Sequence, residues 1–150
     1  MRRVLVLTAV VCVCLGCQSK PNQVHFIIPT GFRGAFAIKP DDPAEGIILV
    51  KEDGRYVVRI PEKGVLSIKD YDPFQSYLCT ASFANGDEIW ASRRVHDRLR
   101  NEQVALLGGT TQVWNKNGKP ASLFWWFIGT EDEWNASDDE TRYRVGAVSK

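Results

Sequence analysis

Two histidines, His25 and His96, are the side chains best suited to moving protons near neutral pH. A catalytic histidine needs a nucleophile or a carboxylate in a defined place. The chain has no G-x-S-x-G turn, no H-E-x-x-H zinc motif, no pair of C-x-x-C motifs and no glycine-rich phosphate loop. Asp97 follows His96 directly, but adjacent residues on a strand point to opposite faces. The sequence therefore predicts no catalytic site and no cofactor, and a hydrolase built on either histidine is the least favoured alternative.

Acidic residues form three clusters, at 41–42, 131–133 and 138–140. Their carboxylate oxygens could hold Ca²⁺, but none of the clusters follows the spacing of a calcium-binding loop. In the second cluster, Glu133 lies three residues after Thr130, which is the pattern of a capping box at the start of a helix. The positive end of a helix favours acidic residues in its first turn. We therefore expect capping or solvated roles and no metal site.

Basic residues are concentrated in one short stretch around His96. They are Arg93, Arg94, Arg98 and Arg100. Together with His96, these guanidinium groups could bind an anion such as a phosphate, a lipid headgroup or an acidic polysaccharide. The alternative is a solvated loop whose charges are balanced by acidic neighbours such as Asp97 and Glu102.

The chain is rich in tryptophan. The five tryptophans are Trp90, Trp114, Trp125, Trp126 and Trp134. Tryptophan rings fill cores, but their faces also stack on sugars or form the centre of protein interfaces. Trp125 and Trp126 are neighbours in the apolar run 123–128, so they point to opposite faces of a strand. We expect core roles for most of the rings, with Trp125 and Trp126 as candidate interface aromatics if one face of that strand is exposed.

The N-terminal residues have the pattern of a secretory signal. Two arginines precede the apolar run 4–15, which is too short to cross a membrane, since a spanning helix needs roughly 20 residues. The run ends in Leu15-Gly16-Cys17, which resembles the bacterial lipobox, where a cysteine is lipidated and becomes the new N-terminus. Cys14 departs from that pattern, because its place usually holds leucine. Cleavage by the ordinary signal peptidase, without a lipid, is the alternative.

Processing at Cys17 would divide the chain into a signal peptide, 1–16, a lipidated tether, 17–23, and a single β domain, 24–150. The anchored product would lie in the cell envelope. Because residue 18 is glutamine rather than aspartate, we expect the outer membrane, facing the periplasm, if the host has two membranes. Cys79 would be the remaining cysteine of the folded domain, so we expect it to be a small buried side chain without a disulfide.

Length and composition predict a globular domain. The chain has 150 residues, of which 44% are hydrophobic and 25% charged, and its formal net charge is +1. Single domains cluster near ~100–150 residues. Nucleic-acid-binding domains usually carry a strong excess of basic residues. The nearly balanced charge and the expected location in the cell envelope therefore exclude nucleic acid as a partner.

Short alternating apolar runs predict an all-β domain with one short helix after Thr130. The expected strands are 24–28, 35–39, 47–51, 55–60, 65–69, 75–83, 88–90, 111–114 and 121–128. Asp53-Gly54, Asn85-Gly86 and Asn117-Gly118 are hairpin turn sequences. We therefore predict an antiparallel β-sandwich or small barrel of about eight strands. The pattern of the segment 92–109 fits either a helix or a long loop.

Three stretches of the chain carry a family resemblance. Residues 26–34 match F-x-I-P-x-G-F/Y-x-G, and the stretches 53–66 and 127–133 agree as well. On these residues the chain resembles the domain-of-unknown-function 6843 family of uncharacterised exported bacterial proteins. The resemblance implies export and the boundary of the folded domain, and it supplies no activity.

The favoured hypothesis is a lipid-anchored, non-catalytic β domain that binds or scaffolds an envelope protein or polysaccharide. Its membrane contact would be the N-terminal lipid. The alternative is a binder of a small ligand, an anionic glycan or a lipid headgroup through the arginine-rich segment.

Overall fold

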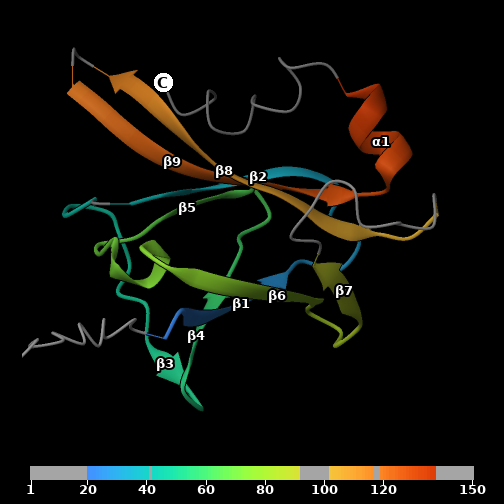
Figure 1. The fold of residues 1–150 in the computed structure, drawn as a ribbon, viewed down its shortest axis with the longest axis horizontal. Helices are drawn as coiled ribbons and strands as arrows, with labels where there is room; N and C mark the ends of the chain where they lie inside the picture. The colour runs from blue at the N-terminus through green and yellow to red at the C-terminus, as the bar shows by residue number, and fades with distance from the viewer. Residues whose placement is uncertain (1–19, 41, 92–101, 117–118, 138–150) are drawn as a thin grey trace, which may run out of the picture.

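The computed structural model describes residues 20–40, 42–91, 102–116 and 119–137, with the side chains of 110–122 outside that description. These residues form one sheet of nine strands that curls into a half-barrel, together with the short helix α1 and one 3₁₀ turn, η1 (Figure 1). The elements are β1 (Asn22–Ile28), β2 (Gly34–Lys39), β3 (Lys51–Glu52), β4 (Arg55–Arg59), β5 (Val65–Ser67), η1 (Asp72–Phe74), β6 (Tyr77–Phe83), β7 (Glu88–Ala91), β8 (Ala105–Lys116), β9 (Lys119–Gly129) and α1 (Glu131–Ala136). The all-β class and the short helix are thus confirmed.

The strand order is β3-β4-β1-β6-β7-β8-β9-β2-β5, and the sheet is mixed rather than antiparallel throughout. β1 pairs in parallel with both β4 and β6, and the pairs β2–β5 and β7–β8 are parallel too. Alternation along a strand indicates which side chains face the core, but it carries no information on the direction of the neighbouring strand. The expectation of an antiparallel sheet is therefore corrected at these four pairs.

Two of the predicted hairpins are present among the described residues. Asp53-Gly54 joins β3 to β4, and both residues have positive φ, 50° and 82°. Asn85-Gly86 lies between β6 and β7, which pair antiparallel. β8 and β9 also pair antiparallel along their whole length, while the Asn117-Gly118 sequence between them lies outside the described residues.

Within the segment 92–109, residues 105–109 form a strand, neither helix nor loop, and 92–101 lie outside the described residues. The register of β8 against β9 shifts between Gly108 and Thr110, as at a β-bulge. Gly108 and Gly109 have φ of 94° and 103°, and a Cβ on Gly108 would lie 2.9 Å from the ring of Trp125. The double glycine therefore marks a bulge and a close backbone approach within a strand.

The main core lies inside the curl, between the half made of β1, β4 and β6 and the half made of β2, β8 and β9 (Figure 1). Its largest rings are Phe26, Phe36, Phe74, Phe124 and Trp126, whose centroids lie 4.8–6.4 Å apart in the contacting pairs. Such offset and edge-on aromatic pairs contribute more than their buried area alone. The tryptophan richness of the sequence is thus explained in part by this core.

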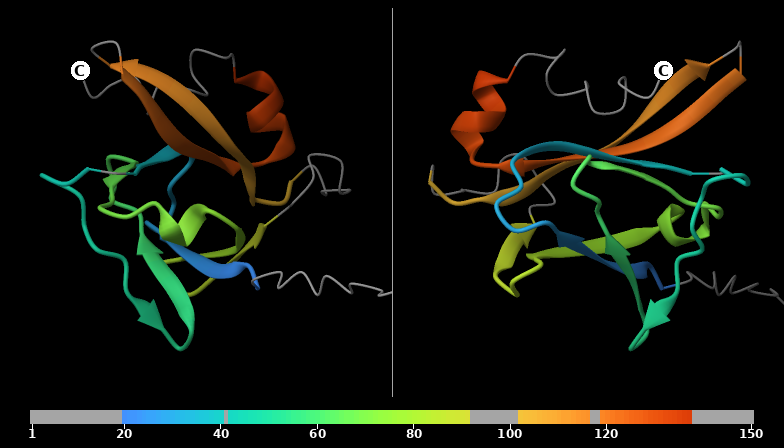
Figure 2. Two further views of the ribbon diagram at one scale, coloured as in Figure 1. Left: turned by 60° about the vertical axis from the view of Figure 1, so that its left-hand side comes forward. Right: turned by 180° about the vertical axis from the view of Figure 1, so that it is seen from behind.

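A second, smaller cluster lies on the outer side of β8, β9 and β2. Trp125 and Phe127 of β9 pack there against Trp134 of α1, with ring centroids 5.3 and 5.6 Å apart. The helix α1 lies over this side of the sheet (Figure 2). α1 begins at the predicted capping box: the Glu133 N–H donates to Thr130 Oγ1, and the Thr130 N–H donates to Glu133 Oε2.

Both faces of β9 are therefore covered over residues 123–128. Trp125 and Trp126 point to opposite faces, as the sequence predicts, yet each is only 1% exposed. The expectation that one of them could serve as an interface aromatic is corrected, because α1 covers one face of the strand and the main core covers the other.

Candidate functional site

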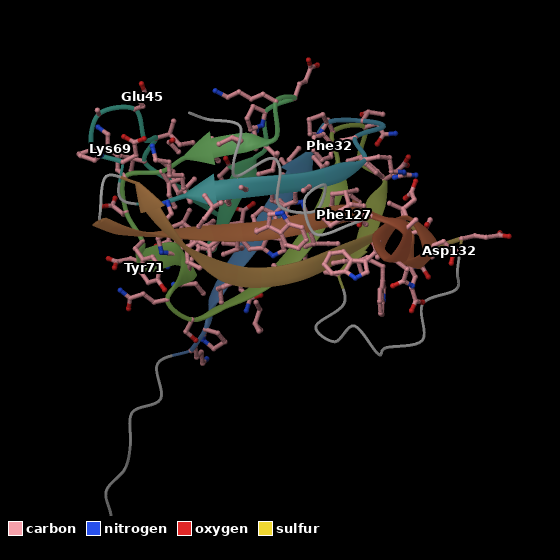
Figure 3. The ribbon with its side chains drawn as sticks, turned by 90° about the horizontal axis from the view of Figure 1, so that it is seen from above. Phe32, Glu45, Lys69, Tyr71, Phe127 and Asp132 are labelled. Carbon is pink, nitrogen blue, oxygen red and sulfur yellow. The ribbon has the colours of Figure 1, made fainter. Side chains whose placement is uncertain are left out.

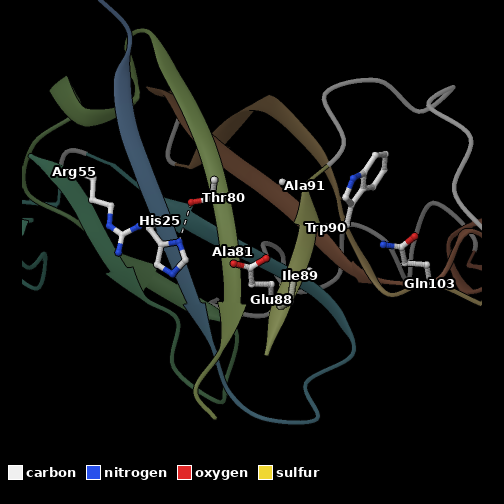
Figure 4. Close-up of a pocket in the computed structure, with 9 residues that line it drawn as sticks. All are labelled: His25, Arg55, Thr80, Ala81, Glu88, Ile89, Trp90, Ala91 and Gln103. Carbon is white, nitrogen blue, oxygen red and sulfur yellow. Dashed lines mark hydrogen bonds between the residues drawn. The ribbon is translucent and has the colours of Figure 1, made fainter. Parts of the chain in front are cut away.

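A pocket lies on the outer face of the half of the sheet that α1 does not cover (Figure 4). Its volume is about 480 Å³, within the range of about 300–1,000 Å³ that is common for small-ligand sites. The side chains that define it come from β4, β1, β6 and β7 and from the residues just before β8, five neighbouring places across the sheet. They are Arg55, His25, Thr80, Glu88, Trp90 and Gln103.

His25 is held in the middle of this face by two hydroxyl groups. Its Nδ1 lies 2.8 Å from Thr80 Oγ1, and its Nε2 lies 3.1 Å from Ser82 Oγ. A neutral imidazole has one N–H and one bare nitrogen, so one hydroxyl accepts a hydrogen bond while the other donates. Burial lowers the pKa of His25 below its ordinary 6.5, the positive charge of Arg55 acts in the same direction, and Glu88 opposes both. The ring is therefore fixed and neutral at neutral pH.

Arg55 and Glu88 place opposite charges on the two sides of His25 (Figure 4). Both side chains are exposed. Among the ion pairs and hydrogen bonds of the described residues, none joins these two side chains to each other. The guanidinium and the carboxylate thus remain accessible to a ligand from the same pocket.

Trp90 supplies an aromatic surface at the other end of the pocket, where Gln103 faces it across the opening (Figure 4). Its neighbour Ile89 is 4% exposed and packs in the core, so the alternation of β7 directs Trp90 outward, where it is 37% exposed. Gln103 is also exposed.

The contact between His25 and Ser82 resembles one half of a nucleophile–base pair, but its surroundings do not favour catalysis. The other ring nitrogen contacts a threonine hydroxyl, not the carboxylate that would orient and stabilise an imidazolium. The register of β1 with β6 runs through both residues, so their backbone N–H groups belong to the sheet and are unsuited to an oxyanion hole. We interpret the network as a rigid floor for the pocket.

The sequence-predicted site residues are distributed differently. Cys17 and the basic group Arg93, Arg94, His96, Arg98 and Arg100 lie outside the described residues, so the anion-site and lipidation predictions stay predictions. Sequence reasoning placed His25 on a strand and missed the polar residues around it. The signal that could have found them is the run of outward polar positions on the alternating strands, but only the strand order brings those positions together.

A separate exposed apolar stretch precedes β3. Ile47, Ile48 and Val50 are 46%, 64% and 65% exposed, whereas Leu49 between them packs against the core. Ile47 forms a parallel bridge with Ile68, and the chain then crosses to the opposite edge of the sheet at β3. Exposed apolar stretches of this kind are candidate contact surfaces.

Histidine, cysteine and carboxylate side chains nowhere gather in a group of three that could hold a metal ion in the part of the chain that the structure describes. The helix within 20–40, 42–91, 102–116 and 119–137 is too short and too polar to cross a bilayer.

No protein-family model matches the chain, and no curated protein matches it in sequence. The likeness to the domain-of-unknown-function family therefore rests on the three motif stretches alone. A 2.75 Å crystal structure of a candidate lipoprotein from Bacillus anthracis has a similar fold, with a TM-score of 0.52. The similarity covers 85% of this chain and 91% of that chain at 11% sequence identity, so it concerns the fold alone.

Proposed function

We propose that this chain is a lipid-anchored protein of the bacterial cell envelope whose β domain binds or scaffolds another envelope component without catalysing a reaction. The observation that carries the proposal is the lipobox-like sequence ending at Cys17, because strand β1 of the folded sheet begins at Asn22, only a short tether away. The similar fold of a candidate lipoprotein supports it.

Two features of the surface favour binding over catalysis. The exposed stretch of Ile47, Ile48 and Val50 offers an apolar contact, and the His25 pocket is open and lined by polar groups of both charges. A catalytic site would need an activated nucleophile or acid–base pair with matched neighbours. In a host with two membranes, the glutamine after Cys17 favours the outer membrane, facing the periplasm.

Lipidation is tested on the full chain expressed in a bacterial host. We expect mass spectrometry to find the mature N-terminus at Cys17 with acyl chains attached, and the protein to sediment with membranes. Cys17→Ser should abolish both, and Cys79→Ser is the matched control that should change neither. A mature N-terminus elsewhere, without acyl chains, would contradict the anchor.

Binding is tested by crosslinking in living cells, with a photoreactive residue in place of Ile48 or Gln103 and, as a control, in place of the exposed Lys63. A single adduct at Ile48 or Gln103 that is missing at Lys63 would support a binding module and mark its face. Crosslinks to a wall polymer would support the same role with a polysaccharide partner. Absence of any adduct at both positions would argue against it.

A further inference from the structure

We infer that the pocket on the outer face of β4, β1, β6 and β7 binds neutral sugar units of a glycan chain. This inference names the ligand class of the binding role proposed above and rests on it.

A pyranose ring has a face of C–H groups and a rim of hydroxyls. Trp90 offers a matching surface, because its indole points outward from β7 and is 37% exposed. Indole rings combine a broad apolar face with a polar edge, which suits a ligand that is apolar on one side and wet on the other.

The groups along the pocket match the rim of hydroxyls. A hydroxyl donates one hydrogen bond and accepts up to two. Gln103, near Trp90, can donate and accept, Glu88 can only accept, and Arg55, at the far end of the pocket, can only donate, so along the pocket they cover the needs of a polyhydroxylated chain. An apolar ligand would leave these groups without partners, at a cost for each group left unpaired.

The charges favour a neutral sugar over an acidic one. Arg55 contributes one positive charge and Glu88 one negative charge, while His25 between them is uncharged at neutral pH. An acidic glycan would gain from Arg55 but would meet the carboxylate of Glu88 in the same pocket. This separates the pocket from the arginine-rich segment, whose chemistry would select anions.

The site is also preorganised in the absence of a ligand. His25 is fixed by Thr80 and Ser82, and the pocket side chains other than Gln103 project from paired strands of one sheet. Binding to a rigid surface avoids the entropy of ordering loops. The pocket is open to solvent and its lining runs across four strands, so a sugar within a longer chain can enter it as well as a chain end.

The test is calorimetry on the full-length lipidated protein in detergent micelles, with maltohexaose, cellohexaose and chitohexaose as neutral probes and polygalacturonate as the acidic one. We expect one neutral hexaose to bind. Trp90→Ala should weaken that binding at least tenfold, and Trp90→Phe should weaken it less, because part of the aromatic surface remains. Glu88→Gln and Gln103→Ala should each weaken it about two- to tenfold.

Glu62→Gln is the matched control, since Glu62 is an exposed carboxylate in the turn before β5, away from the pocket lining, and it should bind like the wild type. Circular dichroism should show that the pocket variants fold, because Trp90, Glu88 and Gln103 are exposed.

Three results would overturn the inference: no neutral hexaose binds, Trp90→Ala binds as tightly as the wild type, or polygalacturonate binds more tightly than every neutral chain. If Cys17 is acylated and a partner crosslinks while no hexaose binds, only the sugar inference fails. If Trp90-dependent sugar binding occurs without acylation, the anchor fails and the sugar site stands.

Discussion

Lys39 and Asp42 show how single side chains close the loop after β2. Lys39 Nζ donates to Asp42 Oδ2 at 2.9 Å, and the Glu45 N–H donates to Asp42 Oδ1 at 3.1 Å. These two hydrogen bonds, the one from Lys39 first, lower the pKa of the Asp42 carboxyl from 3.8 to about 2. Asp42 is 8% exposed, so the ionised form is held by partners within the fold.

The lowered pKa predicts an acid-dependent loss of stability. The folded state holds Asp42 ionised down to about pH 2, whereas the unfolded chain protonates it near 3.8. Its contribution to the free energy of unfolding is therefore full above about pH 4 and is lost as the pH falls toward 2. Urea unfolding of Asp42→Asn should give a shallower dependence on pH between 2 and 4 than the wild type, and a lower stability at pH 7.

The exposed Asp70→Asn variant, outside this hydrogen-bonded loop, is the matched control and should keep the wild-type slope. An Asp42→Asn slope equal to that of the wild type would show that the hydrogen bonds from Lys39 and Glu45 do not govern this window.

At the scale of elements, the same loop packs directly against the end of β5. The Asp42 N–H donates to the Ile68 carbonyl at 3.0 Å, and the Gly46 N–H donates to the Asp42 carbonyl at 2.9 Å. The contact lies at the corner of the molecule where Figure 3 labels Glu45 and Lys69. This corner brings the loop back to the β5 edge of the sheet before the chain crosses to β3.

Gly46 is required there by space and not by its φ angle. A Cβ at this position would lie 2.5 Å from the Ile68 carbonyl carbon and nearer still to the Asp42 carbonyl oxygen, and neither backbone group can turn aside. Gly46→Ala should therefore lower the free energy of unfolding by about 2–3 kcal/mol, as overpacked sites do. Chemical denaturation monitored by tryptophan fluorescence measures it.

Gly86→Ala is the comparison, because Gly86 has a φ of 94° but nothing lies near its Cβ position. The positive φ alone should lower the free energy of unfolding of Gly86→Ala by about 1 kcal/mol. A Gly46→Ala variant no less stable than Gly86→Ala would contradict the close packing of this loop.

At the scale of the molecule, one aromatic core joins the two halves of the curled sheet. Trp126 of β9 contacts Phe26 of β1 at 4.8 Å and Phe36 of β2 at 5.3 Å between ring centroids. The first contact links strands four places apart in the sheet order, so it closes the curl. Loss of the Trp126 ring should therefore destabilise both halves of the sheet together.

Trp126→Ala should therefore lower the free energy of unfolding by about 3–5 kcal/mol, as is usual when a large ring is removed from a core. We expect far-ultraviolet and near-ultraviolet circular dichroism to report one coincident transition, in the variant as in the wild type. Trp90→Ala, which removes a ring from the surface, should cost much less. Two separate transitions would show that the halves of the sheet unfold independently.

Local features of the chain were determined by the sequence alone. Alternating residues located most of the strands, although the expected strand 47–51 is reduced to β3 at Lys51–Glu52 and the first half of β8 was not expected. Asp53-Gly54 and Asn85-Gly86 located two hairpins, and Thr130 with Glu133 located the start of α1. Each of these features depends on residues within a few positions of one another, so a short stretch of sequence is enough to predict it. The lipobox-like sequence at Cys17 is local in the same way.

Only the tertiary structure decided the parallel pairs, the curl and the pocket. His25 meets Thr80 and Ser82 across 55 and 57 residues of sequence, and these contacts exist because β1 pairs in parallel with β6. Which outward residues share a pocket is set by strand order, and strand order is chosen by the packing of the whole core. For the same reason Trp125 was found buried, since α1 returns over the outer face of β9 and covers it.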